Sequence, residues 1–526
     1  MDYSKHVGTR ETSQSEPIFG KDMKQNSAGG FSFGVDDWKR LDRFLILGSE
    51  GGSYYAGERK LTRENAEGVL KCLKSDGVRV VRRVAEISDA GRAPKNDPAI
   101  FVLAMAIGLG DEATKREAAL ALPKVCRTGT HLFTFLENVK SFRKWGRGLR
   151  TAVGKWYSAA DAEKLAYQLV KYRQRNGWTH RDVLRLCHVK PASKIQQSLF
   201  SWVTQGKTSE DLPKIITDFT ALEAAKDEQE VIRILSENPS LPWESVPSQF
   251  LGSAKVWEVF LRHLPMTAMI RNLGRMTTNG LIQPMSEAAK TVAAQLGDVE
   301  RLKKARVHPI ALLAALTTYQ NGHGARGGNS WEPVREVVDA LDGAFYASFG
   351  NVPSTGKRWL LALDVSGSMG GGEVSGVPGL TPRVASAAMA MVTARTEPQY
   401  ACVGFSQRLT PLDISPRQRL DDVLMTISGL PFEGTDCALP MVWALKRKMP
   451  VDTFVVYTDN ETWAGNIHPS QALRKYREQM GIPAKLIVVG MVANEFTIAD
   501  PDDAGMLDVV GFDTATPSVM ADFAVE

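Results

Sequence analysis

The sequence contains few cysteines, and their spacing excludes two common structural roles. Only 5 of its 526 residues are cysteines, and no two of them form a CxxC pair. An odd number of widely separated cysteines argues against a disulfide scaffold and against a thiolate zinc site. We expect reduced, mostly buried thiols, as in a cytoplasmic protein.

Long apolar segments and a secretory leader are also missing. The longest apolar stretch, residues 99–110, is too short to span a bilayer, and the first residues, MDYSKHVGTRETSQ, are polar. Neither a P-loop nor an HExxH motif occurs. A literal GxGxxG lies at residues 322–327, but it follows a helical segment, so it predicts a helix-ending loop rather than a dinucleotide site. We expect no contact with membranes.

Positive charge is concentrated in one short stretch of the chain. The net charge is +5, yet residues 140–194 contain 14 basic and 3 acidic residues, whereas residues 357–526 contain 14 basic and 20 acidic ones. A basic patch on a nearly neutral body is typical of a surface that binds nucleic acid. The alternative is an ordinary solvated helix surface.

The pattern of apolar residues divides the chain into three parts. Residues 1–35 are rich in Gly, Ser and Lys and predict a flexible N-terminal arm. From 36 to 355, apolar residues recur at helical spacing in segment after segment, which predicts a stacked array of helical repeats. From 356 to 526, apolar strands such as RWLLALD and TFVVYTD alternate with helical segments, which predicts a mostly parallel, doubly wound α/β sheet.

Oxygen-bearing side chains follow several strands of this expected sheet. The strand RWLLALD leads into DVSGS, a threonine follows in GTD, and the strand TFVVYTD ends in an aspartate. This order resembles the metal-ion-dependent adhesion site of von Willebrand A domains. Hard oxygen ligands suit Mg²⁺ or Mn²⁺, and the set leaves a position open for an acidic group of a partner. The expected ligands are Asp364, Ser366, Ser368, Thr435 and Asp459.

Two other interpretations of these segments stay open. In one, Asp364 caps a helix and the two serines are turn residues, which accounts for one segment but not for all three. In the other, Asp364, Asp459 and Glu461 form the centre of a metal-dependent ribonuclease. That hypothesis lacks an obvious general base, because His468 is the only histidine in residues 356–526.

The basic stretch is predicted to form two neighbouring helices with basic faces. The first runs from Asp161 to Asn176 and ends at Gly177. The second begins with a capping box of Thr179 and Asp182. The polar stripe of the first helix comprises Lys164, Gln168, Lys171 and Arg175, and the second presents Arg181, Arg185 and His188 on one face.

A run of cations without any acidic residue between them precedes these helices. Its members are Lys140, Arg143, Lys144, Arg147, Arg150 and Lys155. The aromatic residues Trp145, Trp156 and Tyr157 are interleaved with them and could stack on bases, although the two tryptophans are more typical of a helical core. Of the two nearby histidines, His188 is the better candidate for a contact than His180, because it lies on the basic face.

Both halves of the chain together resemble the Ro ribonucleoprotein autoantigens and their bacterial orthologues, the TROVE-domain proteins. The resemblance extends in order from about residue 43 to 514, which is nearly the whole chain. Its characteristic segments include RFLILGSEGGSYY, KYRQRNGWTHRDVLRLCHVKP, RNLGRMT, GKRWLLALDVSGSM and YTDNET. Two features depart from the pattern: Arg181 stands where eukaryotic members tend to have lysine, and the loop of residues 370–381 beside the metal motif is unusually rich in glycine.

The resemblance implies a ring of HEAT-like helical repeats closed by a von Willebrand A domain. It implies that Y RNA binds on an outer basic surface, that single-stranded 3′ ends of misfolded RNA pass through the ring, and that an exoribonuclease such as polynucleotide phosphorylase is a partner in bacteria. The RNA-contacting positions carry over as Lys171, Arg175 and His188. The metal-site positions carry over as the five expected ligands.

We therefore predict a monomeric RNA-binding scaffold that is not an enzyme. The first alternative is a metal-dependent protein-binding adaptor, in which the adhesion-type site has the main role and the basic patch is incidental. The second is the metal-dependent ribonuclease described above.

Overall fold

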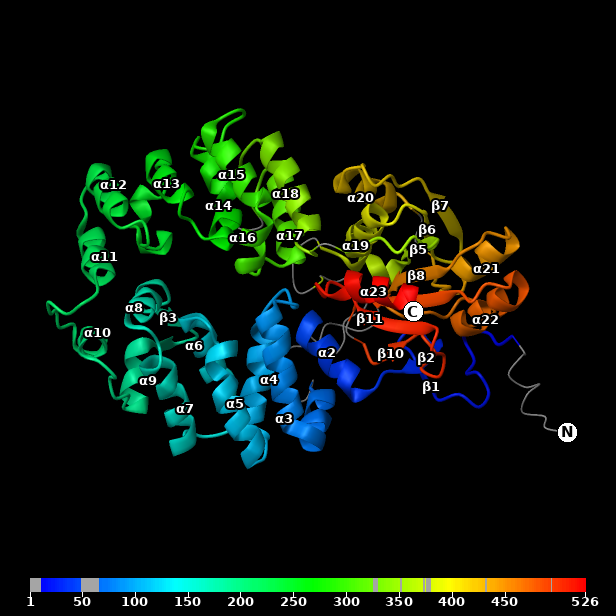
Figure 1. Ribbon diagram of the computed structural model, residues 1–526, viewed down its shortest axis with the longest axis horizontal. Helices are drawn as coiled ribbons and strands as arrows, with labels where there is room; N and C mark the ends of the chain where they lie inside the picture. Colours follow the sequence, from blue (N-terminus) through cyan, green and yellow to red (C-terminus); the bar gives the residue numbers. More distant parts are fainter. Residues whose placement is uncertain are drawn as a thin grey trace. The chain divides into compact units, whose positions relative to one another are not determined.

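The computed structural model describes residues 11–48, 66–324, 330–350, 352–371, 374, 380–430, 433–492 and 494–526. Contacts between residues divide the chain into two compact units. One unit comprises Met1–Lys71, Arg92–Lys95 and Phe349–Glu526, and the other comprises Cys72–Gly91 and Asn96–Ser348. Figure 1 follows the elements of both units along the chain.

The second unit is built of helices, as the apolar spacing predicts. Many of the helices begin at a side chain that accepts a hydrogen bond from the first turn, among them Asp111, Thr128, Asp161 and Ser193. The helices are α3 (Glu67–Ala90), α4 (Asp97–Leu109), α5 (Glu112–Val125), α6 (Gly129–Lys140), α7 (Arg147–Ser158), α8 (Ala162–Lys171), α9 (His180–Cys187), α10 (Lys194–Gln205), α11 (Lys214–Ala224), α12 (Glu228–Glu237), α13 (Ala254–Leu261), α14 (Met266–Thr278), α15 (Glu287–Gly297), α16 (Val299–Lys304), α17 (Pro309–Gln320) and α18 (Arg335–Ala347).

Neighbouring helices of this unit pack in pairs and share their apolar faces. Helix α4 is buried on nearly all sides and packs against α5 and α6, and α18 packs against α15 and α17. Such pairwise stacking is the pattern expected of a helical-repeat array. After α17, residues 321–324 form the loop that the glycine-rich motif predicts, while residues 325–329 lie outside the described part of the chain.

One predicted helix is wrong. Helix α8 ends at Lys171, and residues 174–179 form a small antiparallel hairpin of β3 (Gln174–Arg175) and β4 (Trp178–Thr179). Asn176 and Gly177 occupy its turn with φ angles of +51° and +75°. Asn-Gly is the dipeptide that favours such a two-residue turn, because both positions need positive φ. Arg175 therefore lies on a strand rather than on the stripe that Lys164 begins.

The other unit contains a six-stranded sheet in the order β11-β9-β8-β5-β6-β7, parallel except for β7. Its strands are β5 (Trp359–Asp364), β6 (Tyr400–Phe405), β7 (Leu409–Leu412), β8 (Thr453–Thr458), β9 (Lys485–Gly490) and β11 (Met506–Val510). The helices are α19 (Pro382–Thr396), α20 (Leu420–Ser428), α21 (Leu439–Lys446), α22 (Pro469–Met480) and α23 (Thr516–Val525), with a 3-10 turn η3 at Gly367–Gly370. The predicted doubly wound α/β domain is confirmed.

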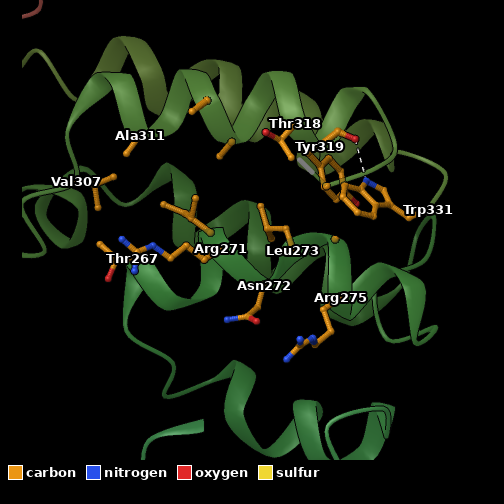
Figure 2. Close-up of a pocket in the computed structure, with 15 residues that line it drawn as sticks. Thr267, Arg271, Asn272, Leu273, Arg275, Val307, Ala311, Thr318, Tyr319 and Trp331 are labelled. Atoms are coloured by element: carbon orange, nitrogen blue, oxygen red, sulfur yellow. Dashed lines mark hydrogen bonds between the residues drawn. The ribbon is translucent and has the colours of Figure 1, made fainter. Parts of the chain in front are cut away.

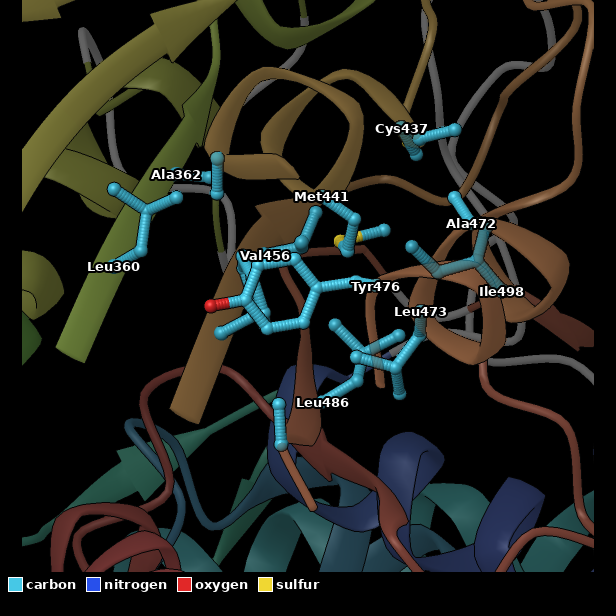
Figure 3. Packing of buried hydrophobic residues seen from close by; sticks show 14 of the residues in the cluster. Leu360, Ala362, Cys437, Met441, Val456, Ala472, Leu473, Tyr476, Leu486 and Ile498 are labelled. Carbon is cyan, nitrogen blue, oxygen red and sulfur yellow. The ribbon is translucent and has the colours of Figure 1, made fainter. Parts of the chain in front are cut away.

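Alternate residues of the central strands are buried on opposite faces of this sheet. Leu360 and Val456 pack with Met441 of α21 and with Leu473 and Tyr476 of α22, as Figure 3 shows. The strand residues between them are also buried, and β5 contacts α19. A sheet covered on both faces explains why its strands are continuous apolar runs.

The expected flexible arm is wrong for residues 11–35. Strands β1 (Met23–Gln25) and β2 (Phe31–Gly34) pair with each other, and β2 pairs with β10 (Phe496–Thr497). Helix α2 (Asp37–Leu47) follows and contacts β11, and its buried Arg43 donates two hydrogen bonds of 2.8 Å to Asp508. Residues 11–47 are thus part of the α/β unit, so the predicted placement of residues 36–47 in the helical array is wrong. Residues 1–10 lie outside the described part.

No helix in the described part of the chain is long and apolar enough to cross a bilayer.

Candidate functional site

The DVSGS segment forms a buried loop at the carboxyl end of β5. One carboxylate oxygen of Asp364 accepts a hydrogen bond from the amide of Ser366 at 2.9 Å, and the other accepts one from the Thr458 hydroxyl at 2.7 Å. The hydroxyl oxygens of Ser366 and Ser368 lie 3.0 Å apart. The loop therefore gathers three oxygen-bearing side chains in one water-excluded place.

The other two expected ligands leave buried oxygens without partners. Asp459 accepts a hydrogen bond from the amide of Glu461 at 3.0 Å through Oδ1, but its Oδ2 has no partner among the described residues. The Thr435 hydroxyl is likewise buried with no hydrogen bond to any described group. Buried polar atoms are normally paired, so two such oxygens in one predicted site fit a role as cation ligands.

The raised pKa values of two carboxyl groups in the site also fit a role in cation binding. Burial, together with the nearby charges of Asp364 and Glu461, raises the pKa of Asp459 well above its usual range, and burial also raises the pKa of Asp364. A divalent cation would remove this cost by pairing with both carboxylates. No three acidic, histidine or cysteine side chains within the described ranges converge as a metal cluster. Two carboxylates with three hydroxyls suit Mg²⁺ or Mn²⁺.

Asp364 does not cap a helix, but Ser366 and Ser368 are turn residues, as the same interpretation predicts, because Ser366 precedes the turn η3 and Ser368 lies in it. Helix α19 begins after Thr381, whose side chain accepts a hydrogen bond from Val384. The turn η3 begins at Gly367, and the preceding Ser366 makes no capping hydrogen bond through its side chain. The glycine-rich loop that departs from the family pattern lies mostly outside the described part of the chain.

The ribonuclease hypothesis gains no support from the surroundings of Glu461 and His468. One oxygen of the Glu461 carboxylate accepts a hydrogen bond from the amide of Ala28 at 3.1 Å. His468 is buried, and its Nε2 lies 2.8 Å from the carbonyl oxygen of Glu16. Burial lowers the pKa of this histidine, and its ring is directed to the N-terminal segment.

Cations of the predicted RNA-binding surface gather around the hairpin. Arg175 lies opposite Trp178 in the strand pairing, and the ammonium of Lys140 is 4.8 Å from the centre of the Trp178 ring. The rings of Trp145 and Trp178 are 5.9 Å apart, and Glu137 accepts a hydrogen bond from the Trp178 indole at 3.1 Å. The exposed Arg175 side chain makes no hydrogen bond or ion pair to a described residue, so it can contact a phosphate.

Lys171 is less accessible than the other cations near the hairpin. Its side chain is only 12% exposed, and its ammonium lies 3.1 Å from the Tyr167 hydroxyl and 4.0 Å from the Glu244 carboxylate. The same ammonium is 5.5 Å from the centre of the Tyr172 ring. This residue can contact RNA only at the edge of a tyrosine cluster, whereas Arg175 projects from a turn.

The two histidines of α9 differ in exposure. The predicted capping box is present: the Thr179 side chain accepts from the amide of Asp182, and the Asp182 carboxylate accepts from the amide of Thr179. His188 ends the helix in the left-handed region, with φ of +49°, and is exposed. His180 is buried, with its Nδ1 2.8 Å from the Tyr157 hydroxyl.

The remaining expected RNA contacts fall into two groups. Arg181 and Arg185 donate hydrogen bonds to the carbonyl oxygens of Val203 and Thr204 at the end of α10, and Arg143 donates one to that of Ile107 at 3.0 Å. These three guanidinium groups hold neighbouring helices together. A second group is exposed and makes no side-chain hydrogen bond or ion pair to a described residue, namely Lys144, Arg147, Arg150 and Lys155.

The aromatic residues of the cation run are mainly core. Trp156 and Tyr157 are buried, and the Trp156 indole donates a hydrogen bond to the carbonyl of Cys126 at 2.6 Å. The core prediction is confirmed for Trp156. Trp145 is partly exposed against Trp178, so it is the one of the three that a base could reach.

A groove of about 700 Å³ between α5 and α7 escaped the sequence analysis. It combines Arg147 and Lys155 with Lys115 and Arg116 of α5, and Leu120 beside them is 68% exposed. The cations of α5 lie about thirty residues before those of α7, and acidic residues alternate with them along the chain. Only the packing of α5 on α7 brings them together, so no pattern in the sequence indicates this groove.

A second cavity, of about 450 Å³, lies between α14 and α17 (Figure 2). Its lining includes Arg271 and Gly274 from the RNLGRMT segment and small side chains of α17 such as Ala311. Trp331 closes one end, and its indole donates a hydrogen bond to the carbonyl of Tyr319 at 2.9 Å. A Cβ atom at Gly274 would lie 2.6 Å from the indole, so the segment needs glycine there.

The helical unit should lose stability as the pH falls. Burial lowers the pKa of His180 to about 4, so the unfolded chain binds a proton at a higher pH than the folded one does. Between pH 7 and 5 we expect a loss of about 2 kcal/mol in unfolding free energy from this residue. Urea unfolding at the two pH values, followed by the fluorescence of neighbouring Trp156, measures it. His180→Gln should lose less between the two pH values, whereas a substitution of the exposed His263 should not alter the difference.

Comparison with known proteins gives consistent matches to both units. A family model described as "TROVE domain" matches residues 24–240 and 233–357, and one described as "Ro60 vWA domain" matches residues 358–524. The chain is 42% identical over 505 residues to "RNA-binding protein RO60" of Deinococcus radiodurans, with 95% of each chain covered. It is 37% identical over 579 residues to the Caenorhabditis elegans protein of the same name, covering 95% of this chain and 89% of that one.

A solved structure is similar over almost the same length. The crystal structure of the Deinococcus radiodurans RO (RSR) protein matches with a TM-score of 0.72 at 42% identity. The match covers 93% of this chain and 99% of that one.

Proposed function

Because the chain belongs to the Ro family of TROVE-domain proteins, we propose that it is an RNA-binding scaffold that holds a small noncoding RNA of the Y type. The observation that carries this proposal is the cluster of cations around the hairpin and α9. Arg175 and His188 project there without partners among the described residues, and Lys140 lies over Trp178. Such groups neutralise phosphates and fix the register of an RNA without reading its sequence.

Membership of the Ro family also leads us to expect a second kind of RNA ligand. Single-stranded 3′ ends of misfolded RNA would pass through the ring that the resemblance implies, and an exoribonuclease would act on RNA held by the scaffold. The ring, the exoribonuclease and the monomeric state remain predictions. The exposed cations Lys144, Arg147, Arg150 and Lys155 extend the charged surface beyond the hairpin and support contact with more than one RNA segment.

The five oxygen-bearing residues of the α/β unit would hold one Mg²⁺ or Mn²⁺ ion. The unpartnered Asp459 Oδ2 and Thr435 Oγ1 support this assignment, because a cation would satisfy both. When bound, the ion would offer an open coordination position to an acidic group of a partner. The same observation favours the alternative function, a metal-dependent adaptor whose main ligand is a protein.

Isolation of the protein from its own cells, followed by sequencing of the copurified RNA, tests the proposal. We expect one abundant small stem-loop RNA, enriched over total RNA. It should stay bound in excess EDTA, because phosphate contacts from Arg and Lys need no bound ion. Loss of the main ligand in EDTA, with no enriched RNA, would establish the adaptor instead.

A separate experiment tests whether the protein cleaves RNA. Labelled RNA incubated with the protein and Mg²⁺ or Mn²⁺ should remain intact. Cleavage that disappears in Asp364→Ala would show a ribonuclease and overturn the scaffold assignment.

A further inference from the structure

The N-terminal segment contributes a fully buried glutamine to the neighbourhood of the cation site. Gln14 lies between the loop that carries Thr435 and the loop that follows Asp459. Its own backbone is held on both sides: its amide donates to the carbonyl of Gly465 at 2.9 Å, and its carbonyl accepts from the amide of Phe31 at 2.8 Å. The side chain therefore has little freedom.

All four hydrogen-bonding positions of the Gln14 amide are used. Its nitrogen donates to the Asp436 carboxylate at 2.7 Å and to the carbonyl of Ile467 at 2.8 Å. Its oxygen accepts from the Thr462 hydroxyl and from the amide of Gly465 at 3.2 Å. A side-chain amide has two N–H donors and an oxygen that can accept two hydrogen bonds, and here all four are used. A buried residue without an amide group could not make the same set of contacts.

The partners of Gln14 are directly joined to the expected ligands. Asp436 follows Thr435 in the chain, and Thr462 is three residues after Asp459. The carbonyl of Thr435 also accepts hydrogen bonds from the amides of Trp463 and Ala464, both at 3.0 Å. One amide side chain thus ties together the two loops that must approach each other for Thr435 and Asp459 to share an ion.

The backbone is shaped to admit this glutamine. A Cβ atom at Gly465 would overlap both the Gln14 amide nitrogen and the Asp436 carboxylate. A second glycine, Gly30 of the N-terminal segment, passes so close to the carbonyl of Thr462 that a Cβ atom would collide with it. Nearby, Asn26 donates a hydrogen bond to the same carbonyl at 2.8 Å. The N-terminal segment is therefore closely fitted to the loop after Asp459.

We propose that Gln14 is a positioning residue of the cation site, which sets the spacing of the Thr435 and Asp459 loops. The proposal rests on the assignment of a cation to this site. Gln14 does not touch the ion; it fixes the loops from the side of Asp436 and Thr462. Groups that orient ligands in this way typically change metal affinity 10- to 100-fold when they are removed.

Titration of the full-length protein with Mn²⁺, by calorimetry, tests this role. Gln14→Met keeps a similar volume and removes all four hydrogen bonds, so we expect Mn²⁺ affinity to fall at least 10-fold. Gln25→Met is the matched control, because Gln25 is an exposed glutamine of the same segment that bonds only locally, to the carbonyl of Gly29. Its Mn²⁺ affinity should equal that of the unmodified protein.

A second variant approaches the same contact from the opposite loop. Thr462→Val keeps the side-chain shape but removes the hydroxyl that donates a hydrogen bond to the Gln14 oxygen and accepts one from the Cys437 amide. It should weaken Mn²⁺ binding in the same direction. If Gln14→Met does not fold, unchanged Mn²⁺ affinity in Thr462→Val overturns the positioning role. Melting temperatures in EDTA are measured in parallel, since a merely structural contact would lower them and leave the Mn²⁺ affinity intact.

The outcomes separate this inference from the cation assignment. Unchanged Mn²⁺ affinity in folded Gln14→Met and Thr462→Val would overturn the positioning role alone. Failure of the unmodified protein to bind Mn²⁺ would overturn the cation site and the positioning role together.

Discussion

We expect RNA affinity to fall about 100-fold when Lys171 and Arg175 are both replaced by alanine. Each charge-assisted contact to a phosphate contributes about 1.5–3 kcal/mol. The loss of two contacts at the lower end of this range would produce a change of this size. The slope of log affinity against log salt should also decrease, by about 0.7 for each lost contact. Arg175→Ala alone should cost more than Lys171→Ala, because Lys171 is already engaged with Tyr167 and Glu244.

Filter binding of the copurified small RNA at several salt concentrations measures both effects. The matched control replaces Lys214 and Arg233, two exposed cations of the same unit that pair with acidic residues on their own helices. That variant should bind within about twofold of the unmodified protein. An unchanged affinity in the Lys171 and Arg175 variant would refute the placement of the RNA, and equal losses in both variants would indicate non-specific attraction.

Asp459→Asn should abolish the stabilisation of the α/β unit by Mn²⁺. A site that binds the ion raises the unfolding free energy by about 2.7 kcal/mol when the ion is at 100 times its dissociation constant. For a domain of this size, about 1 kcal/mol corresponds to 2–4 °C in melting temperature. We therefore expect a rise of several degrees in the unmodified protein and almost none in the variant.

The same substitution should raise the melting temperature in EDTA. Asp459 is buried beside Asp364, and one of its carboxylate oxygens has no partner among the described residues. Removal of one buried negative charge relieves the repulsion between the two carboxylates. Asp413→Asn, at an exposed aspartate of the same unit, is the control and should change neither melting temperature. A full Mn²⁺ response in Asp459→Asn would exclude this residue as a ligand.

The two sites depend differently on the order of residues along the chain. The metal motif consists of short segments that each end a strand, and the carboxyl ends of parallel strands meet at one edge of a sheet. The sequence therefore predicts that distant residues such as Asp364 and Asp459 converge. No such rule applies to the basic surface, because the angles at which helices cross determine which of their faces meet.

Particular residues show where local reasoning failed. The spacing of Lys164, Lys171 and Arg175 fits a helix, yet Asn176 and Gly177 turn the chain into a hairpin. Trp178 of this hairpin contacts Glu137 and Lys140 at the end of α6. The Asn-Gly dipeptide favours a two-residue turn, whereas the spacing of the residues before it favours a helix that ends at Gly177. The gain from burying Trp178 against Trp145 and Lys140 is a tertiary interaction that no local pattern contains.

The prediction of a flexible N-terminal arm is wrong for a related reason. Its composition is typical of a flexible arm, since few of its side chains are apolar. Residues 11–35 are nevertheless part of the α/β unit, because the pairing of β2 with β10 and the hydrogen bonds of the Gln14 side chain provide partners for their polar groups. Those partners are more than 400 residues away in the chain, where no local pattern can indicate them.

By itself, the sequence determined the two architectures, their approximate boundary, the capping of many helices and the place of the oxygen-bearing side chains that follow the strands. Local hydrogen bonding, apolar periodicity and parallel topology are encoded within short segments, so they can be read directly. Only the tertiary structure decided which cations are exposed, which ones hold helices together, and that residues 11–47 complete the α/β unit. These features depend on burial and on partners distant in the chain, and the free energy of burial is a property of the packed molecule rather than of any one segment.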